Sequence, residues 1–230
     1  MYTFAFLPEP ETPLALPLGI QGALAWIGDG TLGAVVEPGL DLEALQTDEH
    51  VLMGAVLAHD RVIQDLFQHS VLLPLQFGTS FKHREGLLQH LEQQRSTYQD
   101  RLDYLSGKVE YTLRLEPQPL SADPAPSPNP EEPPLKGRDY FLAKKQQYQS
   151  LDQRQQQQQD QLQELRTTIG RIYPDLQAAE AKEGVERIYL LVGQRRGNHL
   201  QKQVQQWQTS APLWSLHLSD PLPPYHFVRS

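Results

Sequence analysis

The fold of this chain depends on one stretch, Val71-Leu72-Leu73-Pro74-Leu75-Gln76-Phe77-Gly78-Thr79. The stretch is almost wholly apolar, follows a long helical pattern and is closed by a glycine, which is typical of a buried strand. Because Pro74 has no backbone donor, it belongs at the first residue of the strand or on a sheet edge. Gly78 allows a sharp turn directly afterwards. Helical patterns on both sides predict helices that pack against the sheet that this strand joins.

Further strand patterns lie on both sides of this stretch. Residues 22–27 and 32–36 are joined by Gly28-Asp29-Gly30, which predicts a hairpin because glycines adopt positive φ readily. Residues 109–115 alternate between apolar and polar side chains, which indicates a half-buried strand. We expect the remaining strands at residues 2–7, 188–192 and 212–218.

Helical patterns account for most of the other residues. Asp48 is the expected N-cap of a long amphipathic helix over residues 49–69. We interpret His59, in the middle of its apolar face, as a hydrogen-bonded core histidine. A second helix over residues 82–104 has a thin apolar stripe, so we expect it to pack on one side only. The remaining expected helices are a short turn at 41–45 and residues 137–173, 175–182 and 198–207.

Two stretches of biased composition interrupt the second half of the chain. Residues 117–136 are rich in proline and predict a solvated linker or long loop. In the helix over 137–173, glutamines stand at Gln155 and Gln158, where apolar residues are due. Residues 155–159 are therefore expected to project into water, either as a solvated spacer or as an arm that contacts partners. The same run is also compatible with a break between two helices.

Together these elements predict an α+β protein of two domains. The second half runs strand, long helices, strand, helix, strand, which is the order of a ferredoxin-like sandwich with one internal strand not visible in the sequence. We expect an N-terminal α+β domain over residues 1–105. A modified ferredoxin-like domain with inserted helices and the Pro-rich loop 117–136 follows over residues 106–218, and a Pro/aromatic tail over residues 219–230.

The composition excludes several classes of function. The net charge of −8 argues against nucleic-acid binding, which requires clustered Lys and Arg. The absence of cysteine excludes disulfides, thiolate catalysis and zinc sites built on sulfur. The N-terminus lacks the basic region of a signal peptide, and no apolar run approaches the ~20 residues of a membrane-spanning helix. We therefore expect a soluble, cytoplasmic protein that does not enter the lipid membrane.

The sequence shows no reactive centre. His83 and His90 are two helical turns apart, which is too far for one metal ion, and no His-Glu-x-x-His motif is present. No Gly-x-Ser-x-Gly elbow accompanies Ser70, Ser80 or Ser106. We therefore predict no catalytic residue, no metal, no cofactor and no small-molecule substrate. Two alternatives stay open: a regulatory module that binds a metabolite on a ferredoxin-like scaffold, and an enzyme for a small ligand.

Several motifs, taken in their order along the chain, resemble the gas vesicle protein F/L family. The opening stretch is similar to that family's apolar Leu-Pro-x-x-Phe-Gly-Thr motif. The similarity covers nearly the whole chain, and the Pro-rich and Gln-rich stretches contribute nothing to it. In the tail, Asp220 and Leu222 replace the family's glycine and tryptophan. The other matching motifs are Ala58-His59-Asp60-Arg61-Val62-Ile63, Gly107-Lys108-Val109-Glu110-Tyr111, Gly137 with Tyr140-Phe141-Leu142, and Pro223-Pro224-Tyr225-His226-Phe227-Val228.

The resemblance implies a minor, non-enzymatic protein of the gas vesicle. Such proteins associate with the small hydrophobic shell protein of the GvpA type and with other minor gas vesicle proteins, and they act in assembly or nucleation. A capping role that prevents aggregation of the shell protein follows as a hypothesis, with the protein located at the vesicle shell in the cytoplasm. The residues expected to contact a partner are those of the tail, Pro223, Pro224, Tyr225 and Phe227.

Overall fold

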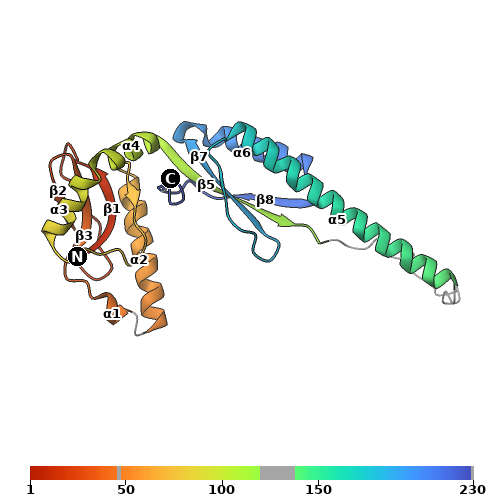
Figure 1. Ribbon diagram of the computed structural model, residues 1–230, viewed down its shortest axis with the longest axis horizontal. Helices are drawn as coiled ribbons and strands as arrows, with labels where there is room; N and C mark the ends of the chain where they lie inside the picture. The colour runs from red at the N-terminus through yellow and green to blue at the C-terminus, as the bar shows by residue number, and fades with distance from the viewer. Residues whose placement is uncertain (46–47, 120–137, 229–230) are drawn as a thin grey trace. The chain divides into compact units, whose positions relative to one another are not determined.

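The computed structural model describes residues 1–45, 48–119 and 138–228 (Figure 1). The chain folds into two compact units. Unit 1 consists of Met1–Tyr111, Leu191–Arg195 and Asp220–Ser230, and unit 2 of Thr112–Leu190 and Arg196–Ser219. Two four-stranded sheets and their helices confirm the predicted α+β class. The predicted domain limits, 1–105, 106–218 and 219–230, stay a prediction. Most of the predicted Pro-rich loop lies outside the described residues.

The sheet of unit 1 is antiparallel and has the strand order β2-β3-β1-β4. Its strands are β1 (Tyr2–Pro8), β2 (Ala25–Gly28), β3 (Leu32–Glu37) and β4 (Leu73–Pro74). β4 lies at the edge, where Pro74 pairs with Ala5, so the predicted edge position of the proline is confirmed. The predicted strand over the whole run 71–79 is wrong, because the chain leaves the ladder after Leu75 and turns at Gly78, whose φ is +93°.

The hairpin between β2 and β3 is confirmed. Gly28 pairs with Gly33 across it, and Gly30 adopts a φ of +88°. The carboxylate of Asp29 closes the turn by accepting hydrogen bonds from the backbone N–H groups of Thr31 at 2.9 Å and Leu32 at 3.0 Å.

Four helices belong to unit 1. They are α1 (Leu42–Leu45), α2 (Glu49–Phe67), α3 (Arg84–Gln93) and α4 (Arg95–Leu105). Asp48 caps α2 as predicted, because Oδ1 accepts from the N–H groups of His50 at 2.8 Å and Val51 at 3.1 Å. The single helix predicted over 82–104 is wrong, since the chain breaks at Gln94. Just beyond the break, Arg95 forms an ion pair with Asp29 at 3.1 Å, a tertiary contact that the local pattern does not reveal.

A chain of hydrogen bonds centred on the buried side chains of Tyr2 and His59 ties α2 to the sheet. The N–H of Gly78 donates to the Tyr2 hydroxyl at 3.4 Å, which donates in turn to Nδ1 of His59 at 2.7 Å. Nε2 of His59 donates to the carbonyl oxygen of Leu75 at 3.0 Å. His59 is only 5% exposed and stacks on Phe4, with 5.2 Å between the ring centroids. The prediction of a core histidine is therefore confirmed, and the arrangement requires a neutral imidazole that carries its proton on Nε2.

The second sheet has the strand order β6-β7-β5-β8, and α5 and α6 lie over one face of it (Figure 1). Buried and half-buried residues alternate along β7, as expected for a strand with one covered face. No helix in the described ranges is long and apolar enough to span a membrane. The elements are β5 (Lys108–Pro117), α5 (Arg138–Ile172), β6 (Gln177–Ala178), β7 (Glu186–Gly193), η1 (Gln194–Arg196), α6 (Gly197–Ser210) and β8 (Trp214–Leu218).

One helix predicted for this part of the chain is absent. The helix predicted over 175–182 is replaced by β6, in which Gln177 pairs with Tyr189, and this is the strand that the sequence did not reveal. A strand of two residues is too short to give a periodic pattern. The chain then reverses at Glu183 and Gly184, which both adopt positive φ.

The Gln-rich run also differs from expectation, because α5 is one continuous helix of 35 residues and Gln158 is buried. Nε2 of Gln158 donates to the carbonyl oxygens of Gln118 at 3.2 Å and Leu213 at 3.0 Å. Its own backbone carbonyl oxygen accepts from Nε1 of Trp214 at 2.9 Å. The other glutamines of residues 155–159 are exposed as predicted. The amide at position 158 thus joins α5 to the residues directly after β5 and before β8.

We predict that unit 1 becomes less stable as the pH falls below about 6.5, the ordinary pKa of histidine. Burial lowers the pKa of His59, against smaller opposing effects of the Leu75 carbonyl and of Asp60. The unfolded chain therefore binds a proton that the folded chain does not. The stability is complete above the unfolded pKa and is lost as the pH falls through the folded one. Hydrogen exchange of the β1 amides at pH 7.5 and pH 5.5 measures this loss.

A His59→Gln variant is the control for this prediction. It should be less stable at pH 7.5 by about 1–3 kcal/mol, because buried partners lose part of their hydrogen bonding. Hydrogen exchange of the β1 amides of this variant should also depend less on pH than in the wild type. Part of the dependence that remains arises from His90, because burial also lowers the pKa of His90. Equal pH dependence in the wild type and the variant would contradict the assignment.

Candidate functional site

The described part of the chain offers no centre for chemistry. No group of three or more His, Asp or Glu side chains is placed there to hold a metal ion. Two of the buried carboxylates, Glu37 and Glu110, hold backbone segments in place, and a third, Glu186, pairs with Arg166 at 2.6 Å. Glu37, which is 1% exposed, accepts from the N–H groups of Ile20 and Gln21 at 2.7 Å and of Gly22 at 2.5 Å, and so fixes the loop before β2.

The C-terminal tail packs into unit 1. Leu222 exchanges two backbone hydrogen bonds with Glu110 of β5, at 2.9 and 2.8 Å. The fully buried carboxylate of Glu110 also accepts from the backbone N–H of His226 at 2.8 Å and from its Nδ1 at 2.6 Å. The tail therefore continues the hydrogen bonding of β5.

The predicted partner-binding residues lie in this packed tail. Pro223, Pro224 and Phe227 are buried, so these three residues pack within unit 1. Tyr225 is half-buried, and its hydroxyl donates to Oδ1 of Asp60 on α2. Burial raises the pKa of Tyr225, and Asp60 raises it further. The assignment of these residues to partner binding stays a prediction.

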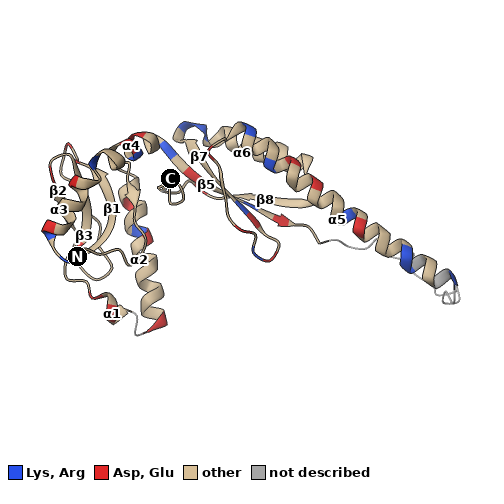
Figure 2. Ribbon diagram, in the orientation of Figure 1, with Lys and Arg blue, Asp and Glu red and all other residues tan. Residues whose placement is uncertain are grey.

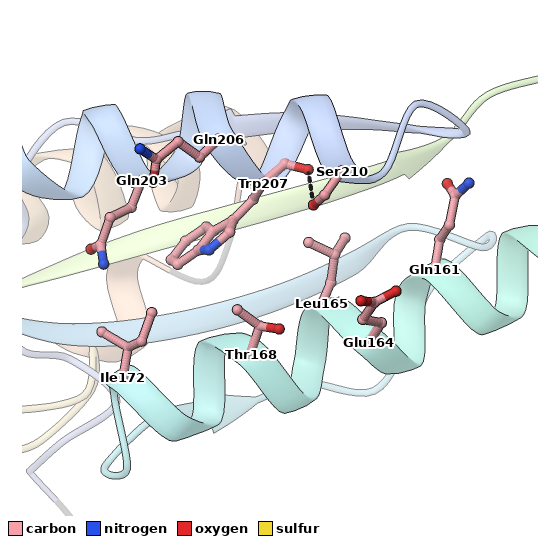
Figure 3. A pocket seen from close by; sticks show the side chains of 9 residues that line it. All are labelled: Gln161, Glu164, Leu165, Thr168, Ile172, Gln203, Gln206, Trp207 and Ser210. Atoms are coloured by element: carbon pink, nitrogen blue, oxygen red, sulfur yellow. Dashed lines mark hydrogen bonds between the residues drawn. The ribbon is translucent and has the colours of Figure 1, made fainter.

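One pocket of about 350 Å³ lies between α5 and α6 (Figure 3). Leu165, Trp207 and Ile172 form its apolar part, and amide side chains surround them. The hydroxyl of Ser210 donates to the Trp207 carbonyl at 2.9 Å, and no histidine lines the pocket to activate it. Such a lining can pack and form hydrogen bonds, but it lacks the nucleophile and base pair of an acyl-transfer site.

The largest departure from ordinary packing is in the first turns of α2. Residues 51–58, Val-Leu-Met-Gly-Ala-Val-Leu-Ala, are all apolar, yet only Ala55 among them is buried. The exposed fractions are 47% for Val51, 56% for Met53, 37% for Val56 and 64% for Leu57. A helix that is apolar all round is normally buried. We call residues 51–58 the apolar turns of α2.

Acidic residues accompany the apolar turns of α2. Figure 2 colours red the Asp and Glu positions along α1 and at the start of α2. These exposed residues are Asp41, Glu43, Asp48 and Glu49. An exposed apolar surface next to charged residues is a common form of interaction site.

Sequence reasoning missed this surface. The spacing of three and four predicts Leu52 and Val56 on the buried stripe of the helix, widened by Val51 and Ala55, but of these four residues only Ala55 is buried. The available signal was the run of apolar residues at every position from 51 to 58, which is wider than the stripe of an amphipathic helix.

Two crystal structures resemble this chain over its full length. The gas vesicle protein GvpF from Microcystis aeruginosa has a TM-score of 0.68 and 16% identity, and the match covers 100% of this chain and 98% of that chain. The gas vesicle protein GvpF from Anabaena sp. PCC7120 has a TM-score of 0.69 and 17% identity, covering 100% of this chain and 95% of that chain. At these identities the likeness shows the fold alone.

The sequence itself matches a known protein family. No curated protein sequence matches the chain. The model of the family described as gas vesicle synthesis protein GvpL/GvpF matches residues 1–229. The resemblance that the motifs indicated is thereby confirmed, and the protein belongs to the gas vesicle synthesis protein GvpL/GvpF family.

Proposed function

We propose that this protein is a non-enzymatic accessory protein of gas vesicle assembly. It binds the small hydrophobic shell protein, of the GvpA type, and prevents its aggregation during the assembly of a vesicle. The observation that carries this proposal is the exposure of the apolar turns of α2, in which Met53 and Leu57 are more than half exposed. Family membership supports an association with gas vesicle proteins.

The apolar turns of α2 suit a hydrophobic partner. A shell subunit exposes apolar surface before it assembles, and such surface aggregates in water. Burial of a Leu or Met side chain contributes about 1.5–3 kcal/mol, so a few such contacts give a moderate, reversible affinity. The nearby carboxylates and the net charge of −8 keep the bound pair in solution.

A non-enzymatic role is also supported by the pocket between α5 and α6. Its polar side chains are mainly amides, and its single carboxylate, Glu164, has no histidine beside it in the lining. Such groups give no acid–base pair of the kind that hydrolytic or transfer reactions use.

For the scaffold, we propose two domains in chain order. Residues 1–105 form an N-terminal α+β domain, and residues 106–218 form a ferredoxin-like domain with a lengthened first helix. The element order β5-α5-β6-β7-α6-β8 supports this, because it is the β-α-β-β-α-β order of that fold. The strand order β6-β7-β5-β8 places the first and third strands of the set in the centre of the sheet.

We propose that the tail, residues 219–230, supports partner binding through α2. Tyr225 donates to Asp60, two residues beyond the apolar turns. Pro223, Pro224 and Phe227 are buried and keep Tyr225 in position. In this proposal the tail stabilises the position of α2 and does not itself contact the partner.

The first experiment introduces charge into the apolar turns of α2. The double variant Met53→Glu/Leu57→Glu should fold normally, because both side chains are exposed. Its affinity for the shell protein should fall about a hundredfold, since each lost contact contributes about 1.5 kcal/mol or more. Co-expression with the shell protein, followed by centrifugation, measures the soluble fraction of the shell protein.

The matched control is Gln89→Glu/Gln93→Glu, which adds the same charge at two exposed positions of α3. We expect the control to keep the shell protein soluble and the α2 variant to lose it. If both variants solubilise the shell protein as well as the wild type does, the apolar turns of α2 are not the binding surface.

The second experiment tests the tail. Tyr225→Phe removes one hydrogen bond to a carboxylate and should lower the unfolding free energy by about 1.5–3 kcal/mol. Shell-protein binding below the unfolding transition should stay near the wild-type level, because the tail acts through α2. Urea titration and a pull-down assay measure the two quantities, with Tyr148→Phe as the control on an exposed ring. A loss of binding without a loss of stability would instead place Tyr225 in direct contact with the partner.

A further inference from the structure

The helix α5 carries a heptad repeat along its whole length. Large apolar residues occupy most positions at steps of three and four, the spacing of positions a and d in a coiled coil, with Lys144, Gln155 and Gln158 at the others. Position a is occupied by Phe141, Tyr148, Gln155, Leu162 and Ile169. Position d is occupied by Lys144, Leu151, Gln158, Leu165 and Ile172.

The two halves of this repeat have different surroundings. From Gln158 onward the repeat is partly covered: Leu165 and Ile169 are 3% and 0% exposed, whereas Ile172 at the end of the helix is 44% exposed. Before Gln158, no described side chain of α5 is buried, and Phe141 and Tyr148 are 73% and 60% exposed. Figure 1 shows this half of α5 continuing beyond the strands of its sheet. Residues 138–157, which we call the N-terminal half of α5, are about 30 Å long at the rise of an α-helix.

We propose that the N-terminal half of α5 binds the same segment of a second copy of this chain, as an antiparallel pair of helices. The apolar positions of the repeat provide the contact, with Tyr148 of one copy against Leu151 of the other. The proposal does not depend on the proposed function, and it concerns a surface different from the apolar turns of α2.

The charges of the N-terminal half of α5 favour a second copy of this chain as the partner, in the antiparallel orientation. A parallel pair in register would place Lys144 against Lys144 of the second copy at a core position, which is unfavourable. The antiparallel pair instead places Lys145 of each copy beside Asp152 of the other, at the positions flanking the core. Lys145 and Asp152 are exposed in the single chain. Two pairs of opposite charge, Lys145 of each copy with Asp152 of the other, therefore flank the apolar contact.

The symmetry of this contact has a consequence for binding. An antiparallel pair of identical helices is a closed, two-fold contact, so association stops at the dimer. The dimer carries two copies of every other surface, including the apolar turns of α2. Two linked sites raise the effective affinity for a partner that presents many identical subunits.

The first test is sedimentation velocity of the full chain over concentrations from about 1 to 200 μM, the range expected for a short helix pair. We expect a reversible monomer–dimer equilibrium. Tyr148→Asp should weaken dimerisation at least tenfold, while Gln149→Asp, which adds the same charge at the next, also exposed position, should not change it. A monomer at every concentration, or an equal effect of both variants, would overturn the proposal.

A charge exchange provides the second test. Lys145→Asp and Asp152→Lys, each alone, place like charges together and should weaken the dimer. The double variant Lys145→Asp/Asp152→Lys restores opposite charges and should recover the wild-type dimer. Failure of the double variant to recover it would overturn the antiparallel arrangement. Open-ended species larger than dimers would also overturn the antiparallel arrangement, because they indicate a head-to-tail contact. One such contact would place the basic N-terminal half of α5 of one copy on the acidic residues beside the apolar turns of α2 of another.

Discussion

The hydrogen-bonded chain from Gly78 through Tyr2 and His59 to Leu75 is the constraint on which unit 1 depends. It joins the first strand, the long helix and the turn after the edge strand through the buried side chains of Tyr2 and His59. Each donor has an acceptor only while the imidazole is neutral, so the path fixes the protonation state of His59 together with the packing. A buried polar network is stabilising when every member is paired, as here.

A second principle of construction is the use of buried carboxylates to fix segments rich in proline. Prolines remove backbone donors, so the loop before β2 and the C-terminal tail pair only locally, as Leu222 of the tail does with Glu110. Glu37 collects the free N–H groups of the loop, and Glu110 collects the backbone and side chain of His226 in the tail. Charge-assisted hydrogen bonds compensate the burial of each carboxylate. These charges serve structure, which is why no reactive pair results from them.

The two surfaces that we propose for binding partners lie on helices that extend past the elements packed against them. The first turns of α2 are apolar on all sides but are covered only at Ala55, and the N-terminal half of α5 continues its repeat without a covering sheet. In each case the helix is longer than its intramolecular packing requires. Membership of the gas vesicle synthesis protein GvpL/GvpF family gives these surfaces a context of assembly with other gas vesicle proteins.

The sequence by itself determined the α+β class, the family, the N-cap at Asp48, the hairpin at Gly30 and the core position of His59. Each of these follows from a local pattern or a motif, because propensity, capping and periodicity act over a few residues. Only the tertiary structure decided the break at Gln94, the short strand β6, the burial of Gln158 and the packed tail. These features depend on partners distant in sequence, such as Asp29 for Arg95 and Trp214 for Gln158. A local pattern shows which residues need partners, and only the folded chain shows which of them remain exposed.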